Sequence, residues 1–132
     1  MEFRKMVKVV LALASVVGLP AALQAGPYSK WIGTAPACGA SAKDCEDLSL
    51  HHWMDNSYGD GHKCTSGTKV LCVQAQPSLY EKPFWLGTAP ACGAKPEHCV
   101  AENAEFIAWG SAGDGNPCST GWKVLCARKK SN

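Results

Sequence analysis

The chain has 132 residues, of which 13 are lysine or arginine and 11 are aspartate or glutamate, giving a formal net charge of +2 at pH 7. This balance excludes the dense basic surface that nucleic-acid binding requires. Eight cysteines in so short a chain favour a small protein held together by disulfides over one that depends on a large hydrophobic core.

The N-terminus has the pattern of a secretory signal peptide. Three basic residues precede an uncharged apolar run over residues 9–19, which is too short to span a bilayer as a helix. We place the cleavage after Ala25, so that residues 1–25 are removed and no membrane anchor remains. The sequence therefore predicts a secreted or periplasmic protein. Ten basic and ten acidic residues remain after cleavage, so the positive net charge belongs to the export signal.

The rest of the chain contains an internal repeat. Residues 31–72 align without a gap to residues 85–126, and 20 of the 42 aligned positions are identical. Both copies have the cysteine spacing C-x6-C-x18-C-x7-C. We therefore predict a first module over 26–72, a linker over 73–84 that its two prolines make semi-rigid, a second module over 85–126, and a basic tail over 127–132.

The cysteines are predicted to be disulfide-bonded within each module: Cys38, Cys45, Cys64, Cys72, Cys92, Cys99, Cys118 and Cys126. Three pairings per module are possible. We favour the nested one, which joins Cys38 to Cys72 and Cys45 to Cys64, because the first and last predicted strands each end in a cysteine. Zinc sites use more closely spaced cysteine pairs, so neither a metal nor another cofactor is expected.

The shared residues predict strands and turns, and hence a small, disulfide-rich, mainly β fold. One strand is expected over 31–35 and another over 69–72, each with an equivalent in the second module. The two Gly-Asp-Gly sequences predict turns in which Asp60 and Asp114 cap their own backbone. Gly67 lies between short β-prone runs and predicts a hairpin, as does its equivalent.

One contiguous segment differs almost completely between the copies. It covers residues 46–56 and 100–110, and its second half is predicted to be a strand that leads into the Gly-Asp-Gly turn. A short helical turn is possible before it, around 102–106. Because strand faces alternate, Trp53 and Asp55 would share one face, and so would their equivalents in the second module.

Aromatic residues outside the shared framework are the best candidates for ligand binding. Exposed aromatic side chains can stack on sugar rings or anchor a protein partner, and variable surfaces tend to carry specificity. Trp31 and Trp85 are shared, and we expect them to form core. The candidate ligand-binding residues are Trp53, Tyr58, Phe106, Trp109 and Trp122.

No catalytic constellation is common to the two modules. The histidines at 51, 52, 62 and 98 do not align with one another. Asp60 and Asp114 are the only shared acids, so neither module has the carboxylate pair that a glycosidase needs. The shared serines have no shared histidine to activate them. The sequence therefore predicts that the protein is not an enzyme.

The blocks W-x-G-T-A-P-x-C and G-D-G-x2-C-x2-G-x-K-V-L-C resemble a recurrent module of small secreted proteins that is loosely grouped with sushi (complement-control) domains. True sushi domains have longer intervals between their first cysteines and a tryptophan shortly before the last one. Only Trp122 lies near that place here. The resemblance implies an extracellular all-β binding module and supplies no catalytic residue.

These observations together predict an exported, non-catalytic binding protein whose two related modules recognise an extracellular glycan or protein. The alternative is a secreted inhibitor, toxin or effector that presents a loop to an extracellular enzyme or host protein. No nucleic-acid partner is expected.

Overall fold

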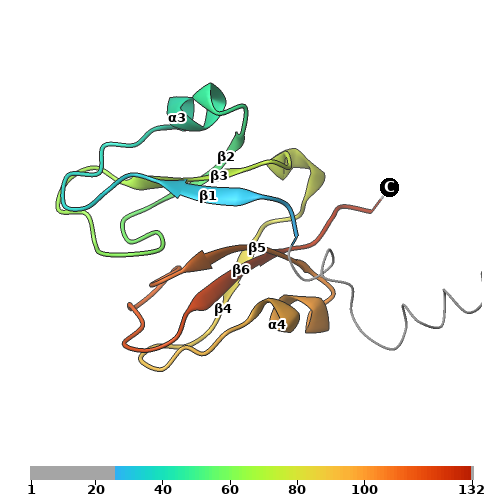
Figure 1. The fold of residues 1–132 in the computed structure, drawn as a ribbon. Coiled ribbons are helices and arrows are strands. Elements are labelled where there is room, and N and C mark those ends of the chain that lie inside the picture. The colour runs from blue at the N-terminus through green and yellow to red at the C-terminus, as the bar shows by residue number, and fades with distance from the viewer. Residues whose placement is uncertain (1–25, 132) are drawn as a thin grey trace, which may run out of the picture.

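The computed structural model describes residues 26–131 and contains two three-stranded antiparallel sheets, each covered by one short helix on its outer face (Figure 1). The strand orders are β1-β3-β2 and β4-β6-β5. The elements are β1 (Ser29–Ile32), α3 (Ala42–Asp47), β2 (His51–Asn56), β3 (Lys69–Val73), the 3-10 turn η1 (Pro77–Leu79), β4 (Phe84–Leu86), α4 (Pro96–Ala101), β5 (Glu105–Gly110) and β6 (Lys123–Ala127). The predicted small, disulfide-rich, mainly β fold is confirmed. The predicted signal peptide lies outside the described residues.

The central strands β3 and β6 are buried along their whole length. Successive side chains on a strand point to opposite faces, so each central strand contributes to two layers. Leu71 of β3 and Leu125 of β6 point inward and share one apolar cluster between the sheets. Val70 and Cys72 point outward and pack with Cys45 of α3. The order of layers is therefore helix, sheet, sheet, helix.

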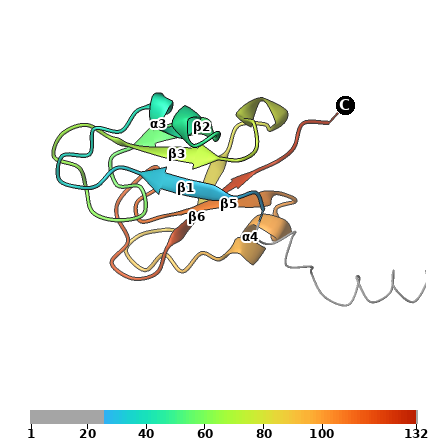
Figure 2. The same cartoon turned by 45° about the horizontal axis from the view of Figure 1, so that its top comes forward.

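The two sheets contact each other through side chains and backbone as well as through this cluster. Figure 2 shows β1 lying along β5, where the Trp31 Nε1 donates a hydrogen bond to the carbonyl oxygen of Trp109 at 2.8 Å. At the end of β2, the Asn56 Nδ2 donates a hydrogen bond to the carbonyl oxygen of Gly113 at 2.9 Å. The two modules thus share one core and one set of hydrogen bonds.

The segment predicted as a linker also contributes to that core. The carbonyl oxygen of Ala75 accepts a hydrogen bond from the Trp53 Nε1 at 2.9 Å. The Tyr80 ring is only 5% exposed and meets the Trp53 ring edge-on, with 5.2 Å between the ring centroids. The Tyr80 hydroxyl donates to Glu105 at 2.7 Å. Residues 73–84 therefore hold the two sheets together as well as connecting them.

Tyr80 is expected to make stability fall at alkaline pH. Burial, and then the hydrogen bond to Glu105, raise the pKa of Tyr80 to about 12, whereas a tyrosine in the unfolded chain ionises near about 10. The unfolded state therefore loses this proton first, and the free energy of unfolding falls as pH rises from about 10 to about 12, by about 2 kcal/mol. Denaturant unfolding at the two ends of this range should show the loss. It should be absent in Tyr80→Phe and retained in Tyr28→Phe, since Tyr28 is exposed.

The nested disulfide pairing is wrong. Each module joins its first cysteine to its third and its second to its fourth: Cys38–Cys64, Cys45–Cys72, Cys92–Cys118 and Cys99–Cys126. Strand β1 ends at Ile32 rather than at 35, six residues before Cys38, and its residue opposite Cys72 is Lys30. The first cysteine therefore does not lie beside the last one. Instead, α3 places Cys45 directly over β3.

The predicted helical turn over 102–106 is also wrong, because the helix lies earlier and contains the second cysteine of the module. Residues 105 and 106 already belong to β5. Each helix begins with a hydrogen bond from the backbone to a side chain. The Ser41 N–H donates to Asp44 at 2.8 Å, and the Lys95 N–H donates to the Nδ1 of His98 at 3.1 Å. Asp44 and His98 occupy equivalent positions, so His98 acts here as a helix-capping residue.

Gly67 does not form the predicted hairpin turn. It lies where the loop before β3 meets the loop after β1, at a backbone bridge between Ala37 and Ser66. Gly67 has a φ of +68°, and a Cβ at this position would lie 2.6 Å from the Gly39 nitrogen. Glycine is therefore required for this close approach of two backbone segments. Gly121 has the same surroundings in the second module.

Candidate functional site: an aromatic hollow between the two modules

A β-bulge decides which side chains of the variable segment point outward. The register shifts between His52 and Met54 in β2 and at the equivalent place in β5. The extra residue brings His52 and Asp55 to one face, opposite Cys72 and Val70. The prediction that Trp53 and Asp55 share a face is therefore wrong, and it is wrong for the equivalents too, since Ile107 is fully buried while Trp109 is 40% exposed.

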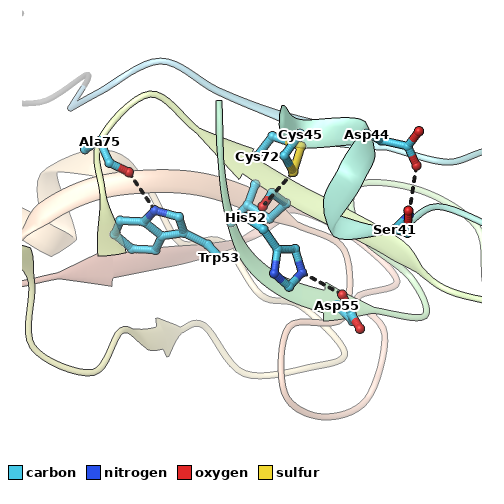
Figure 3. The surroundings of a disulfide bond; sticks show 9 residues. Ser41, Asp44, Cys45, His52, Trp53, Asp55, Cys72 and Ala75 are labelled. Atoms are coloured by element: carbon cyan, nitrogen blue, oxygen red, sulfur yellow. Dashed lines mark hydrogen bonds and ion pairs between the residues drawn. A yellow bond between two sulfur atoms is a disulfide. The ribbon is translucent and has the colours of Figure 1, made fainter. Parts of the chain in front are cut away.

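The two modules place different chemistry on this face. In the first module, His52 and Asp55 contact each other (Figure 3), and the His52 Nε2 lies 2.7 Å from the Asp55 Oδ1. In the second module the equivalent residues are Phe106 and Trp109, whose ring centroids lie 5.2 Å apart in an edge-to-face arrangement. The same backbone geometry therefore carries a polar pair in one module and an aromatic pair in the other.

Trp122 extends the aromatic pair of the second module. Its ring centroid lies 6.4 Å from that of Trp109, with 68° between the planes. Trp109 and Trp122 are 40% and 42% exposed, whereas Phe106 is 8% exposed and belongs to the core next to α4. Two indole rings are thus presented to solvent on a buried aromatic support. The residue equivalent to Trp122 in the first module is Thr68.

The first module closes this surface with its Gly-Asp-Gly turn. Asp60, Trp109 and Trp122 line a hollow of about 340 Å³, which we call the aromatic hollow. An adjoining hollow of about 320 Å³ shares Asp60 and Trp122 with it and is also lined by His62 and Lys63. These volumes lie at the lower end of the range for small-molecule sites, roughly 300–1,000 Å³.

Hydrogen bonds between the modules hold the two sides of these hollows together. The Ser111 N–H donates to the carbonyl oxygen of Gly59 at 2.9 Å, and the Ser111 hydroxyl donates to that of Gly61 at 2.8 Å. Both acceptors flank Asp60. Ser111 directly precedes the turn of the second module, so neither module alone could form the site.

Four of the five predicted ligand-binding aromatics gather here. Trp109 and Trp122 line the aromatic hollow, Phe106 supports them, and Tyr58 lines the adjoining hollow. Trp53 does not belong to the group. It packs against the core between the sheets, and Figure 3 shows its ring turned toward Ala75 and away from His52. Trp53 therefore does not contribute to the surface that the other four aromatic residues form.

The predicted turns occur at Asp60 and Asp114, but other residues hold them. The Gly61 N–H donates to the carbonyl oxygen of Tyr58 at 3.0 Å, and the second module repeats this bond. Within residues 26–131, neither aspartate side chain forms a hydrogen bond, so they do not cap the turn. The Asn56 Oδ1 instead accepts from the Tyr58 and Gly59 N–H groups at 2.9 Å each.

A buried lysine lies under each turn, and neither lysine was predicted from the sequence to be buried. Lys69 and Lys123 are each only 4% exposed. Their Nζ atoms donate to the carbonyl oxygens of Tyr58 and Ala112, at 3.0 Å and 2.8 Å. The available signal was a shared lysine at the start of an otherwise apolar strand, because a buried ammonium must have a polar partner. Lys69 thereby fixes the turn that presents Asp60, and Lys123 fixes the turn that contains Asp114.

No other cluster with evident chemistry appears among the described residues. Over residues 26–131, no group of three or more histidine, cysteine, aspartate or glutamate side chains is arranged to hold a metal ion. In the same part of the chain, no helix is both long enough and apolar enough to cross a membrane. We compared the chain with protein-family models, curated proteins and solved structures, and none of them matches it.

Proposed function

We propose that this chain is an exported, non-catalytic binding protein that recognises an extracellular glycan through the aromatic hollow. The observation that carries the proposal is the exposed pair Trp109 and Trp122, supported from below by the buried Phe106. Exposure of two neighbouring indole rings to water is unfavourable, and a role in ligand binding explains why they are not buried. Indole faces stack on the C–H faces of sugar rings, and the neighbouring polar groups can bond sugar hydroxyls.

The disulfides support export. Four disulfides fit a secreted or extracellular protein, because such bonds persist in oxidising compartments and are rare in the cytosol. The predicted signal peptide and the resemblance to secreted sushi-like modules point the same way. We accordingly propose secretion or a periplasmic location.

The size of the site favours a glycan over a protein partner. A stable protein interface buries roughly 1,200–2,000 Å² in total around several anchors. Among residues 26–131, the other large exposed apolar side chains are Tyr28, Leu48 and Leu79, and none of them lines either hollow. The exposed apolar surface of the aromatic hollow thus comes from two indole rings. The equivalent surface of the first module is polar, so the proposal concerns one site rather than two.

Alanine substitution of the two tryptophans tests this function. Trp109→Ala and Trp122→Ala are each expected to weaken glycan binding at least about 30-fold, the effect of losing a binding hot spot. A glycan array would identify the ligand, and isothermal titration calorimetry would measure its affinity. Thermal unfolding of each variant would show that the fold is retained.

The first module offers matched controls. Asp55→Ala and Thr68→Ala change the positions equivalent to Trp109 and Trp122, and both should bind as the wild type does. An array without any bound glycan, or full affinity in the variant that lacks both tryptophans, would rule the proposed function out.

A further inference from the structure

We infer that the glycan bound in the aromatic hollow carries a free, protonated amine, which the carboxylate of Asp60 receives. The inference rests on the proposed function, because it concerns the same site, and it names the class of sugar. It comes from the chemistry of the three residues that line the hollow: two indoles and one carboxylate.

Asp60 is free to bind a ligand. It lies on the exposed side of the turn, and within residues 26–131 its carboxylate forms neither a hydrogen bond nor an ion pair. The turn does not need this side chain, because Asn56 and Lys69 hold the backbone before it and Ser111 holds the Gly61 carbonyl after it. The Asp60 carboxylate is therefore held in place by its backbone while its oxygen atoms remain available.

The indole rings add to the attraction for a cation. The face of an indole carries negative charge density, and a cation near such a face is stabilised, most strongly for tryptophan among the aromatic residues. In the aromatic hollow, Trp109 and Trp122 lie beside Asp60, which is the one ionisable residue of the described chain that lines it. Lys63 and His62 line the adjoining hollow instead. The electrostatics of the aromatic hollow thus favour a positive group.

An amino sugar satisfies both parts of the site at once. Its ring can lie against an indole face, while its ammonium group donates a charge-assisted hydrogen bond to the Asp60 carboxylate. A neutral or N-acetylated sugar offers the ring without the charge. A basic peptide offers the charge, but the exposed apolar surface beside the hollow is too small to anchor a protein.

Two oligosaccharides that differ only in acetylation test the inference. Glucosamine oligomers and N-acetylglucosamine oligomers of the same length would be titrated into the oxidised protein at about pH 5.5, where the free sugar amines are protonated. We expect the free-amine oligomer to bind at least about 10-fold more tightly, the usual effect of a hydrogen bond to a charged group. In Asp60→Asn most of this preference should be lost, which leaves only the contribution of the indole faces.

Asp114→Asn is the matched control, because it makes the same change in the equivalent turn of the second module, which lines a different hollow. This variant should keep the preference for the free amine. A preference that survives Asp60→Asn undiminished would overturn the inference.

Other outcomes separate this inference from the proposed function. Binding of both oligomers with equal affinity, lost in Trp109→Ala, would overturn the amine assignment and leave glycan binding standing. Tighter binding of N-acetylarginine amide than of the glucosamine oligomer, sensitive to Asp60→Asn, would assign the site to a basic protein segment and overturn the assignment to an amino sugar. Absence of binding by every oligosaccharide, here and on the array, would overturn both.

Discussion

Replacing Cys45 and Cys72 together with alanine is expected to destabilise the protein more than replacing Cys38 and Cys64. The two disulfides close loops of nearly the same length, with sequence separations of 27 and 26 residues. Chain entropy alone therefore assigns each about 3.5 kcal/mol of the free energy of unfolding. Burial distinguishes them, because Cys45 and Cys72 are both fully buried, whereas Cys38 is half-buried. The cavity left by the buried pair should add about 1–2 kcal/mol.

Urea unfolding of the two double variants measures this difference. The second module provides a replicate of the experiment, because Cys99 and Cys126 are fully buried in the same way. Their replacement should cost more than replacement of the other pair of that module. Equal losses within each module would show that only the closed loop matters. Peptide mapping without reduction should first recover the fragment that joins Cys38 to Cys64.

The framework of the fold could be predicted because each of its features has a local cause. The sequence Lys-Val-Leu-Cys forms the central strand in both modules, as its β-prone residues predict. The second half of each variable segment likewise forms the predicted strand, β2 or β5. In both cases the residues themselves favour the observed backbone, so no knowledge of distant contacts was needed.

The β-bulge could not be predicted, and it determines the site. The residues around it share no type between the modules, since His52 and Trp53 align with Phe106 and Ile107. A strict two-residue alternation then assigns the next side chains to the wrong faces. This single inserted position explains why Trp53 belongs to the core while Trp109 faces solvent.

The disulfide pairing and the site between the modules could not be predicted from the sequence, for a related reason. Both depend on which surfaces meet in space. The pairing follows from the placement of α3 over β3, and the helix was expected too late in the chain. The aromatic hollow needs Asp60 from one module beside Trp109 from the other. A comparison of the two copies reveals what differs between them, but it contains no information about how they pack on each other.

Ile107→Ala is expected to lower the free energy of unfolding by about 3–4 kcal/mol, and to do so for both modules together. Ile107 is fully buried in the cluster that Leu71 and Leu125 share between the sheets, and removal of buried methyl groups leaves a cavity there. The exposed Leu79 is the control, and Leu79→Ala should cost less than about 0.5 kcal/mol. Denaturant unfolding of both variants measures these losses.

Amide hydrogen exchange shows whether the two modules unfold as one unit. If the core is shared, Ile107→Ala should speed the exchange of Leu71 in β3 as much as that of Leu125 in β6, although only the second module was changed. Faster exchange confined to Leu125 would show that the modules unfold separately. Joint unfolding has a consequence for binding, because the aromatic hollow takes side chains from both modules and keeps its shape only while they remain packed together. A ligand that occupies it should then protect Leu71 and Leu125 equally.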